Sequence, residues 1–275
     1  MGIGPNGELA ASDQEGHWTP ANRINLVKKD GFYGNMYSYH RGQRPAEFDP
    51  PVCWLPRNVD RSPAEQLWVT SDRWGPIQGK MIALSYGTGK AFLVNYEQAD
   101  GVYQGGAMRL PIATFPTGIM RGRFHPGDGQ LYACGLFGWS SDRTQPGGFY
   151  RIRYTGIPFH VPVGLKVKEK GVEITFSNPL DENEAEDPEN YAVKQWNYRW
   201  TANYGSDHYS VAQPNRKGED EVYVEDVTVS DDKKTVFIEL EETQPVMQME
   251  IAYTIAAADG TEIRQTIYNT INVVP

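Results

Sequence analysis

Short stretches in which apolar and polar residues alternate are the main pattern of the first part of the chain. They predict eight strands, over residues 8–12, 23–28, 66–70, 80–85, 91–96, 120–124, 130–134 and 149–154. Alternation with a period of two is typical of half-buried strands, and the Gly and Asp residues between them favour turns. The 28 glycines and 19 prolines of the chain fit many short strands. We therefore expect an all-β protein whose first part is built like propeller blades.

Residues 155–164 separate this part from a second region of alternating stretches, and Pro158 and Pro162 interrupt the strand pattern there. Seven further strands are predicted, over residues 164–171, 171–178, 190–200, 221–232, 234–242, 247–260 and 266–274. Seven short strands with turns between them favour a β-sandwich of the immunoglobulin or fibronectin type. The phrases DPENYAV and VTVSDDKKTVFIEL resemble bacterial Ig-like modules. The predicted domains are residues 1–157, a partial propeller, and 158–275, the sandwich.

Three segments in the first part of the chain are informative. PNGELAASDQEGHWTPANRINLVKKDGFYGN begins at Pro5, CWLPRNVDRSP begins at Cys53, and GIMRGRFHPGDGQLYACG begins at Gly118. In this order they resemble segments of the soluble sugar dehydrogenases that use pyrroloquinoline quinone (PQQ), and of the related sorbosone-dehydrogenase-like proteins. The resemblance covers about residues 2–155. At roughly 40 to 45 residues per blade, it implies about three blades, the C-terminal half of such a propeller.

The resemblance implies a cofactor site at Gln14, Trp54, Arg121 and Arg123. PQQ is a flat tricarboxylate, so guanidinium groups suit its carboxylates and an indole offers a ring face. Arginines on inner strands also pair with neighbouring blades, and an isolated tryptophan often serves packing; both alternatives stay open here.

Two departures from the family pattern affect the expected activity. Asn22 and Arg23 stand where the family has an acidic pair, and the family's general-base histidine lies upstream of the turn at which this sequence begins. Hydride transfer from an alcohol needs such a base. We therefore expect a carbohydrate-related protein that is catalytically incomplete as an isolated chain. Because three blades leave strand edges unpaired, we also expect a homodimer or a partner chain that completes the propeller.

Two long connections, over residues 32–51 and 135–148, are rich in aromatic and polar side chains. Tyr37, His40, Arg41 and Trp139 are the predicted residues for binding a carbohydrate or small polyol. Sugar C–H faces lie on aromatic rings while hydroxyls bond to polar groups. These aromatics also suit the filling of gaps between blades. Two alternatives to the oxidoreductase-like scaffold follow: a non-catalytic carbohydrate-binding module and, with less support, a hydrolase or metal-dependent enzyme using Asp13, Glu15, His17 and His125.

The segment between Trp196 and Glu221 is unusually rich in Trp, Tyr and Asn for an Ig-like module. We expect it to dock on the first domain; a carbohydrate-binding surface of its own is the alternative. An aromatic-rich insert left in water would form an apolar patch of the kind that proteins usually cover.

Composition narrows the range of partners. The formal net charge of −9 from 35 acidic and 26 basic residues argues against nucleic acid. No run approaches 18 apolar residues, so membrane insertion is not expected, and the family resemblance implies a periplasmic or secreted protein. The two cysteines, Cys53 and Cys134, have no CxxC spacing and are expected to be buried free thiols, with a disulfide between them as the alternative. The five histidines have no metal-site spacing.

Overall fold

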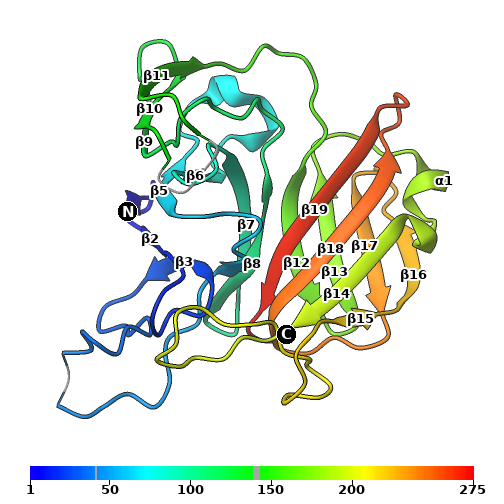
Figure 1. The fold of residues 1–275 in the computed structure, drawn as a ribbon. Coiled ribbons are helices and arrows are strands. Elements are labelled where there is room, and N and C mark those ends of the chain that lie inside the picture. Colours follow the sequence, from blue (N-terminus) through cyan, green and yellow to red (C-terminus); the bar gives the residue numbers. More distant parts are fainter. Residues whose placement is uncertain (41, 139–142) are drawn as a thin grey trace.

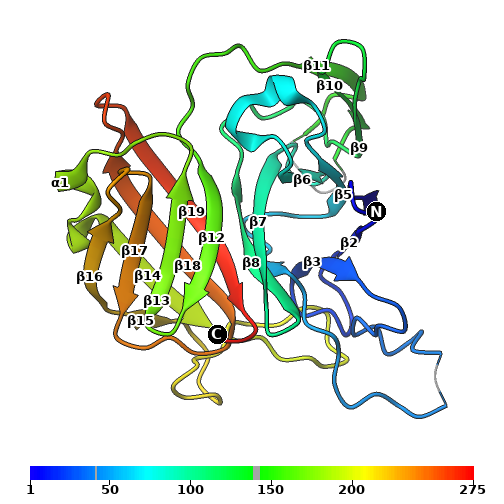
Figure 2. The same cartoon turned by 180° about the vertical axis from the view of Figure 1, so that it is seen from behind.

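The computed structural model describes residues 1–40, 42–138 and 143–275 and shows an all-β protein, as predicted. Its strands form four antiparallel sheets (Figures 1 and 2). Within the described residues no sheet closes on itself, since each has two edge strands. Helical turns are short: η1 (Asp72–Ile77), α1 (Glu182–Ala185) and η2 (Pro188–Asn190).

The N-terminal sheet has four strands in sequence order. These are β1 (Gly2–Ile3), β2 (Leu9–Asp13), β3 (Asn22–Val27) and β4 (Cys53–Leu55). Ala10, Ile24 and Cys53 of this sheet pack against Trp68, Phe92 and other buried side chains of the next sheet. The long connection between β3 and β4 leaves the sheet and forms the loops at the lower left of Figure 1.

The largest sheet has eight strands and runs through both predicted domains. Its first half is β5 (Pro63–Trp68), β6 (Met81–Ser85), β7 (Ala91–Ala99) and β8 (Val102–Arg109). Its second half is β19 (Glu262–Ile271), β18 (Val246–Ala256), β14 (Tyr191–Trp196) and β15 (Asp220–Val222). The halves join where β19 pairs with β8, from Ile267 opposite Met108 to Thr270 opposite Gly105. Residues 1–157 and 158–275 therefore share one sheet.

A second sheet covers the C-terminal half of this large sheet. Its strands are β12 (Pro162–Lys168), β13 (Gly171–Phe176), β17 (Thr235–Leu240) and β16 (Val224–Val229), paired in that order. Their inward residues alternate along each strand, as Val172, Ile174 and Phe176 do in β13. The two layers enclose the main core, to which residues of the first part such as Leu93 and Met108 also contribute.

A three-stranded sheet completes the fold and lies at the upper left of Figure 1. It consists of β9 (Arg121–Phe124), β10 (Leu131–Leu136) and β11 (Gly147–Ile152), with β10 in the centre. Leu131 and Ala133 face the main core, whereas Arg121, Arg123 and Phe149 are exposed. One face of this sheet is therefore open.

Candidate functional site

A wide cleft with a volume of about 1050 Å³ lies beside the N-terminal sheet. Its walls come from the end of β2, the turn that follows it, the connection after β3 and one residue of the segment after β14. The lining combines aromatic rings, carboxylates and amides: Asp13, Gln14, Glu15, His17, Asp30, Phe32, Tyr33, Asn35, Tyr37, Tyr39, His40 and Tyr204. Such a mixture offers both ring faces and hydrogen-bond acceptors to a ligand.

His17 lies between two exposed tyrosines of this cleft. Its ring meets Tyr37 edge-on at 6.0 Å and Tyr204 at 5.6 Å between centroids. Its Nδ1 donates a hydrogen bond to the Ala202 carbonyl at 2.8 Å, which holds the imidazole in place. Tyr37 is 71% exposed and Tyr204 is 55% exposed, so both rings present surface to solvent.

Gln14 borders the same rings. Its Nε2 donates to the Tyr204 hydroxyl at 3.3 Å, and its Oε1 accepts from the Ser62 hydroxyl at 2.9 Å. The amide is thereby oriented at the edge of the cleft.

The segment between Trp196 and Glu221 docks on the first part of the chain, as predicted. Its backbone forms hydrogen bonds with the turn that follows β2. Trp18 N–H donates to the Thr201 carbonyl, and Gly205 N–H donates to the Gly16 carbonyl. Trp200 adds an indole N–H that lies 3.1 Å from the Trp18 carbonyl and 2.9 Å from that of Gly34. Two chain regions that are about 180 residues apart therefore build one cleft.

A smaller cleft of about 440 Å³ continues from the first and shares Glu15 and Tyr204 with it. The Glu15 carboxylate is 12% exposed and lies 3.6 Å from Arg57. Burial raises the pKa of Glu15, and the positive charge of Arg57 partly opposes that rise. On the far wall, His208 stacks on Trp196 at 4.4 Å and its Nδ1 lies 2.8 Å from Glu219 Oε1.

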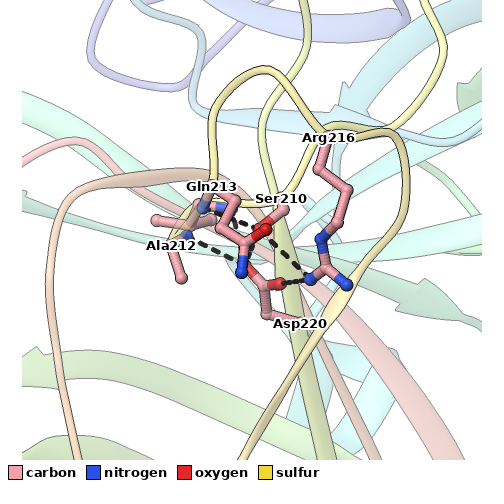
Figure 3. A network of polar contacts seen from close by, with 6 residues as sticks. Ser210, Ala212, Gln213, Arg216 and Asp220 are labelled. Carbon is pink, nitrogen blue, oxygen red and sulfur yellow. Dashed lines mark hydrogen bonds and ion pairs between the residues drawn. The ribbon is translucent and has the colours of Figure 1, made fainter.

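Asp220 holds the end of this docked segment in shape (Figure 3). Its Oδ2 accepts from the Ser210 hydroxyl and from the amides of Val211 and Ala212, at 2.6 to 3.0 Å. Its Oδ1 accepts from Arg216 at 2.7 Å. Burial raises the pKa of Asp220, but these hydrogen bonds and the Arg216 charge together hold it below its usual value. The carboxylate thus serves the loop rather than a ligand.

Arg23 anchors the connection after β3 from within the core. Its guanidinium donates to Asn25 Oδ1 at 2.7 Å and to the carbonyls of Tyr33 and Asp49 at 3.2 and 2.6 Å. Asn25 in turn donates to Asp13 at 2.9 Å. These bonds tie the loop that carries Tyr37 to the end of β2, which carries the cleft carboxylates.

The structure brings some of the predicted binding residues together in the wide cleft and places others elsewhere. Gln14, Tyr37 and His40 line the wide cleft together. Arg121 and Arg123 lie on β9 in the three-stranded sheet, where Arg123 pairs with buried Glu65 at 2.7 Å. The other two predicted ligand-binding residues, Arg41 and Trp139, lie outside the described part of the chain.

Trp54 is 1% exposed and is covered by Arg23, Phe48 and Tyr198. Its ring therefore has no free face for a quinone in this arrangement. No contact within the described residues joins Gln14, Trp54, Arg121 and Arg123, and their shared PQQ site stays a prediction.

The residues considered for a metal-dependent or hydrolytic enzyme divide in the same way. Asp13, Glu15 and His17 line the wide cleft, whereas His125 lies beside Asp128 in the turn between β9 and β10. Within the described ranges there is no group of three or more His, Cys, Asp or Glu side chains arranged for a metal ion. The described chain also has no helix long and apolar enough to cross a membrane.

The two cysteines are free. Cys53 is buried, as expected, but Cys134 is exposed and the expectation was wrong for it. Cys134 lies on β10 between Arg121 and Phe149 of the neighbouring strands, on the open side of the sheet.

Tyr204 is the main cleft residue that the sequence did not single out by number. The Trp, Tyr and Asn content of its segment was the available indication, but the pattern did not show which ring would reach the cleft.

No family model, curated protein or solved structure matches this chain.

Proposed function

We propose that this protein binds carbohydrate, or a related neutral polyol, in the wide cleft. The observation that carries the proposal is the cluster in which His17 holds the exposed rings of Tyr37 and Tyr204 beside Gln14. Exposed rings fixed by their neighbours offer flat apolar surface at low entropic cost, which suits the C–H face of a sugar ring.

The polar groups of the cleft favour a neutral ligand. Asp13, Glu15 and Asp30 supply acceptors for sugar hydroxyls, and their negative charge disfavours carboxylated or phosphorylated ligands. The volume of about 1050 Å³ is slightly above the usual range for small-molecule sites, roughly 300 to 1,000 Å³. Together with the adjoining smaller cleft, it suits an oligosaccharide better than a single sugar.

Native affinity electrophoresis in gels that contain soluble neutral polysaccharides, namely a β-glucan, a galactomannan and a xylan, tests the proposal. The wild-type protein is expected to be retarded by at least one of them. Tyr37→Ala and Tyr204→Ala each remove an exposed ring and are expected to weaken binding at least fivefold. Tyr223→Ala is the matched control, because Tyr223 is 69% exposed and lies away from the cleft. Retardation by none of the polymers, or equal retardation of the Tyr37 and Tyr223 variants, would contradict the proposal.

A carbohydrate hydrolase is the second candidate, favoured by the acid-base character of the cleft. Glu15 has a pKa that is raised because its side chain is largely buried, and Asp13 lies two residues away on the same wall. Most glycosidases use a pair of catalytic carboxyl groups whose environments give them different pKa values. Reducing-sugar release from the same polymers distinguishes the candidates: release by the wild type that Glu15→Gln abolishes supports hydrolysis, and binding without release supports a binding module.

A further inference from the structure

The open face of the three-stranded sheet carries an ordered array of arginines and rings. Arg123, Tyr132 and Arg151 lie in register across β9, β10 and β11, and Arg121, Cys134 and Phe149 form the next row. Arg121, Arg151 and Phe149 are exposed, and the Arg123 side chain is 74% exposed. The Tyr132 and Phe149 rings stack at 5.8 Å with an angle of 27°.

We propose that this face binds an anionic polysaccharide, a site separate from the neutral-sugar cleft. Charge is the first argument. Residues 118–154 contain five arginines and two aspartates, a net charge of +3, whereas the whole chain has −9 and the remaining residues therefore have −12. A basic face on an otherwise acidic protein selects an anionic partner.

The arginines are available for that partner. Arg121 donates to the neighbouring Met120 carbonyl, and Arg151 forms a hydrogen bond with the Tyr132 side chain, but no carboxylate within the described chain pairs with either arginine. Arg123 is different, because its Nη1 lies against buried Glu65. Asp128 also touches the face, where it accepts from the Tyr132 hydroxyl at 2.8 Å and lies 3.3 Å from His125. The face keeps a positive excess after these pairs.

The spacing of the array indicates a polymer. Two residues along a strand are about 7 Å apart and two strand spacings are about 10 Å, so the guanidinium groups are spread out and do not converge on one small anion. Spread guanidinium groups suit the repeated carboxylates or sulfates of an acidic sugar chain. The exposed Phe149 ring, 73% accessible, offers a surface for the sugar rings between those charges.

Nucleic acid fits this face less well. Its charge density, one charge per about 1.7 Å of duplex, would meet repulsion from the −12 of the remaining chain. A polysaccharide with one carboxylate per sugar has fewer charges per unit length than a duplex and needs only the local array.

Affinity electrophoresis of the full chain at low salt tests the inference with four polymers: polygalacturonate, dextran sulfate, neutral dextran and single-stranded oligo-dT. We expect retardation by polygalacturonate or dextran sulfate, which identifies carboxylate or sulfate as the recognised group, and weakening of that retardation by salt. The double variant Arg121→Gln/Arg151→Gln is expected to lose at least tenfold in affinity, and Phe149→Ala at least threefold. Arg109→Gln/Arg264→Gln removes the same charge from exposed positions on β8 and β19 and is expected to bind normally.

Several outcomes would overturn the inference. These are retardation by neither anionic polysaccharide, stronger retardation by oligo-dT than by both, or equal loss in the two double variants. Tyr37→Ala should leave anionic binding unchanged, and Arg121→Gln/Arg151→Gln should leave neutral-polymer binding unchanged. Failure at this face and failure of the cleft proposal are therefore distinguishable. Far-ultraviolet circular dichroism of each variant confirms that it is folded.

Discussion

The guanidinium carbon of Arg23 lies 4.8 Å from the centre of the Trp54 ring, and each residue is 1% exposed. The rings of Tyr33 and Phe48 flank the same cation at 5.7 and 5.1 Å. A desolvated cation among aromatic faces gains cation–π attraction, which offsets part of the cost of burial. Burial lowers the pKa of Arg23 to about 10, so the group stays charged at neutral pH.

Arg23→Ala is expected to lower the free energy of unfolding by about 3 to 5 kcal/mol, the range for removing one member of a buried charged network. The variant leaves the Tyr33 and Asp49 carbonyls without their donors. Urea denaturation followed by tryptophan fluorescence measures the change. Lys217→Ala is the control, since both members of its ion pair with Asp207 are exposed and the pair should contribute little to stability. Similar losses of unfolding free energy in both variants would show that the buried contacts of Arg23 contribute no more to stability than an exposed ion pair.

Trp54 and Arg23 also show where sequence reasoning stops. The residues next to Trp54 in the sequence do not reveal that the loop returning at Phe48 and the segment at Tyr198 cover the indole ring. Contacts between positions so far apart depend on the whole fold. For the same reason, Tyr37 and His40 could be chosen from local composition and Gln14 from the family resemblance, whereas their neighbour Tyr204 could not be chosen from either.

The fold was predictable to a similar degree. The alternating stretches correctly indicated an all-β chain, but β1, β4 and β8 were missed. In β8, Gly105 and Gly106 weaken the strand pattern, although Asp100–Gly101 is a strong hairpin turn. A Cβ added at Gly106 would lie 2.8 Å from side-chain atoms of Ile267 and Leu165. Gly106, which weakens the strand pattern of β8 in the sequence, therefore permits the close approach of β19 to β8.

Asp60 makes stability depend on pH. The carboxyl group is 1% exposed and accepts a hydrogen bond from Ser85, and burial raises its pKa from 3.8 to about 7. The folded state therefore binds a proton more tightly than the unfolded state. The stability due to this protonation is complete below pH 3.8 and is lost as the pH rises to about 7.

Asp60→Asn keeps an acceptor for Ser85 and removes the buried charge. It is expected to stabilise the protein at pH 8, by at most about 4 kcal/mol at about 1.4 kcal/mol per pKa unit, with a smaller gain at pH 5. Thermal unfolding across pH 5 to 8 measures the effect. Asp231→Asn, a change at an exposed turn, should follow the wild-type profile. An Asp60→Asn profile parallel to the wild type would show that Asp60 does not titrate in this window.

The two thiols should react differently. Burial raises the pKa of Cys53 to about 12, so this thiol is both protonated and enclosed, whereas Cys134 is exposed on β10. Since the thiolate is the reactive form, Ellman's reagent should titrate one thiol in the native protein and both after unfolding in guanidinium chloride. Cys134→Ser should abolish the native reaction, and Cys53→Ser should leave it intact. Native reaction of both thiols would mean that the N-terminal sheet opens readily.

Trp200 is expected to control the docking of the segment that carries Tyr204. Its indole N–H is shared between the Trp18 and Gly34 carbonyls, and its ring meets Trp18 at 5.1 Å and Phe48 at 5.3 Å. Trp200→Phe keeps an aromatic ring but leaves both carbonyls without this donor, at a cost of about 1 to 3 kcal/mol. Limited proteolysis should therefore cut within residues 200–209 several times faster than in the wild type.

Trp74→Phe is the matched control for this prediction. Trp74 also donates its indole N–H to a carbonyl, that of Gly129 at 2.9 Å, but it lies in η1 beside the three-stranded sheet. Its replacement should cost a similar free energy without accelerating cleavage within residues 200–209. The same Trp200 variant should weaken neutral-sugar binding, because Tyr204 follows from the displaced backbone and forms one side of the His17 cluster. The contrary result is rapid cutting of the wild type within residues 200–209 while the remaining chain stays intact. It would show that these contacts do not hold the segment and that the cleft wall forms without them.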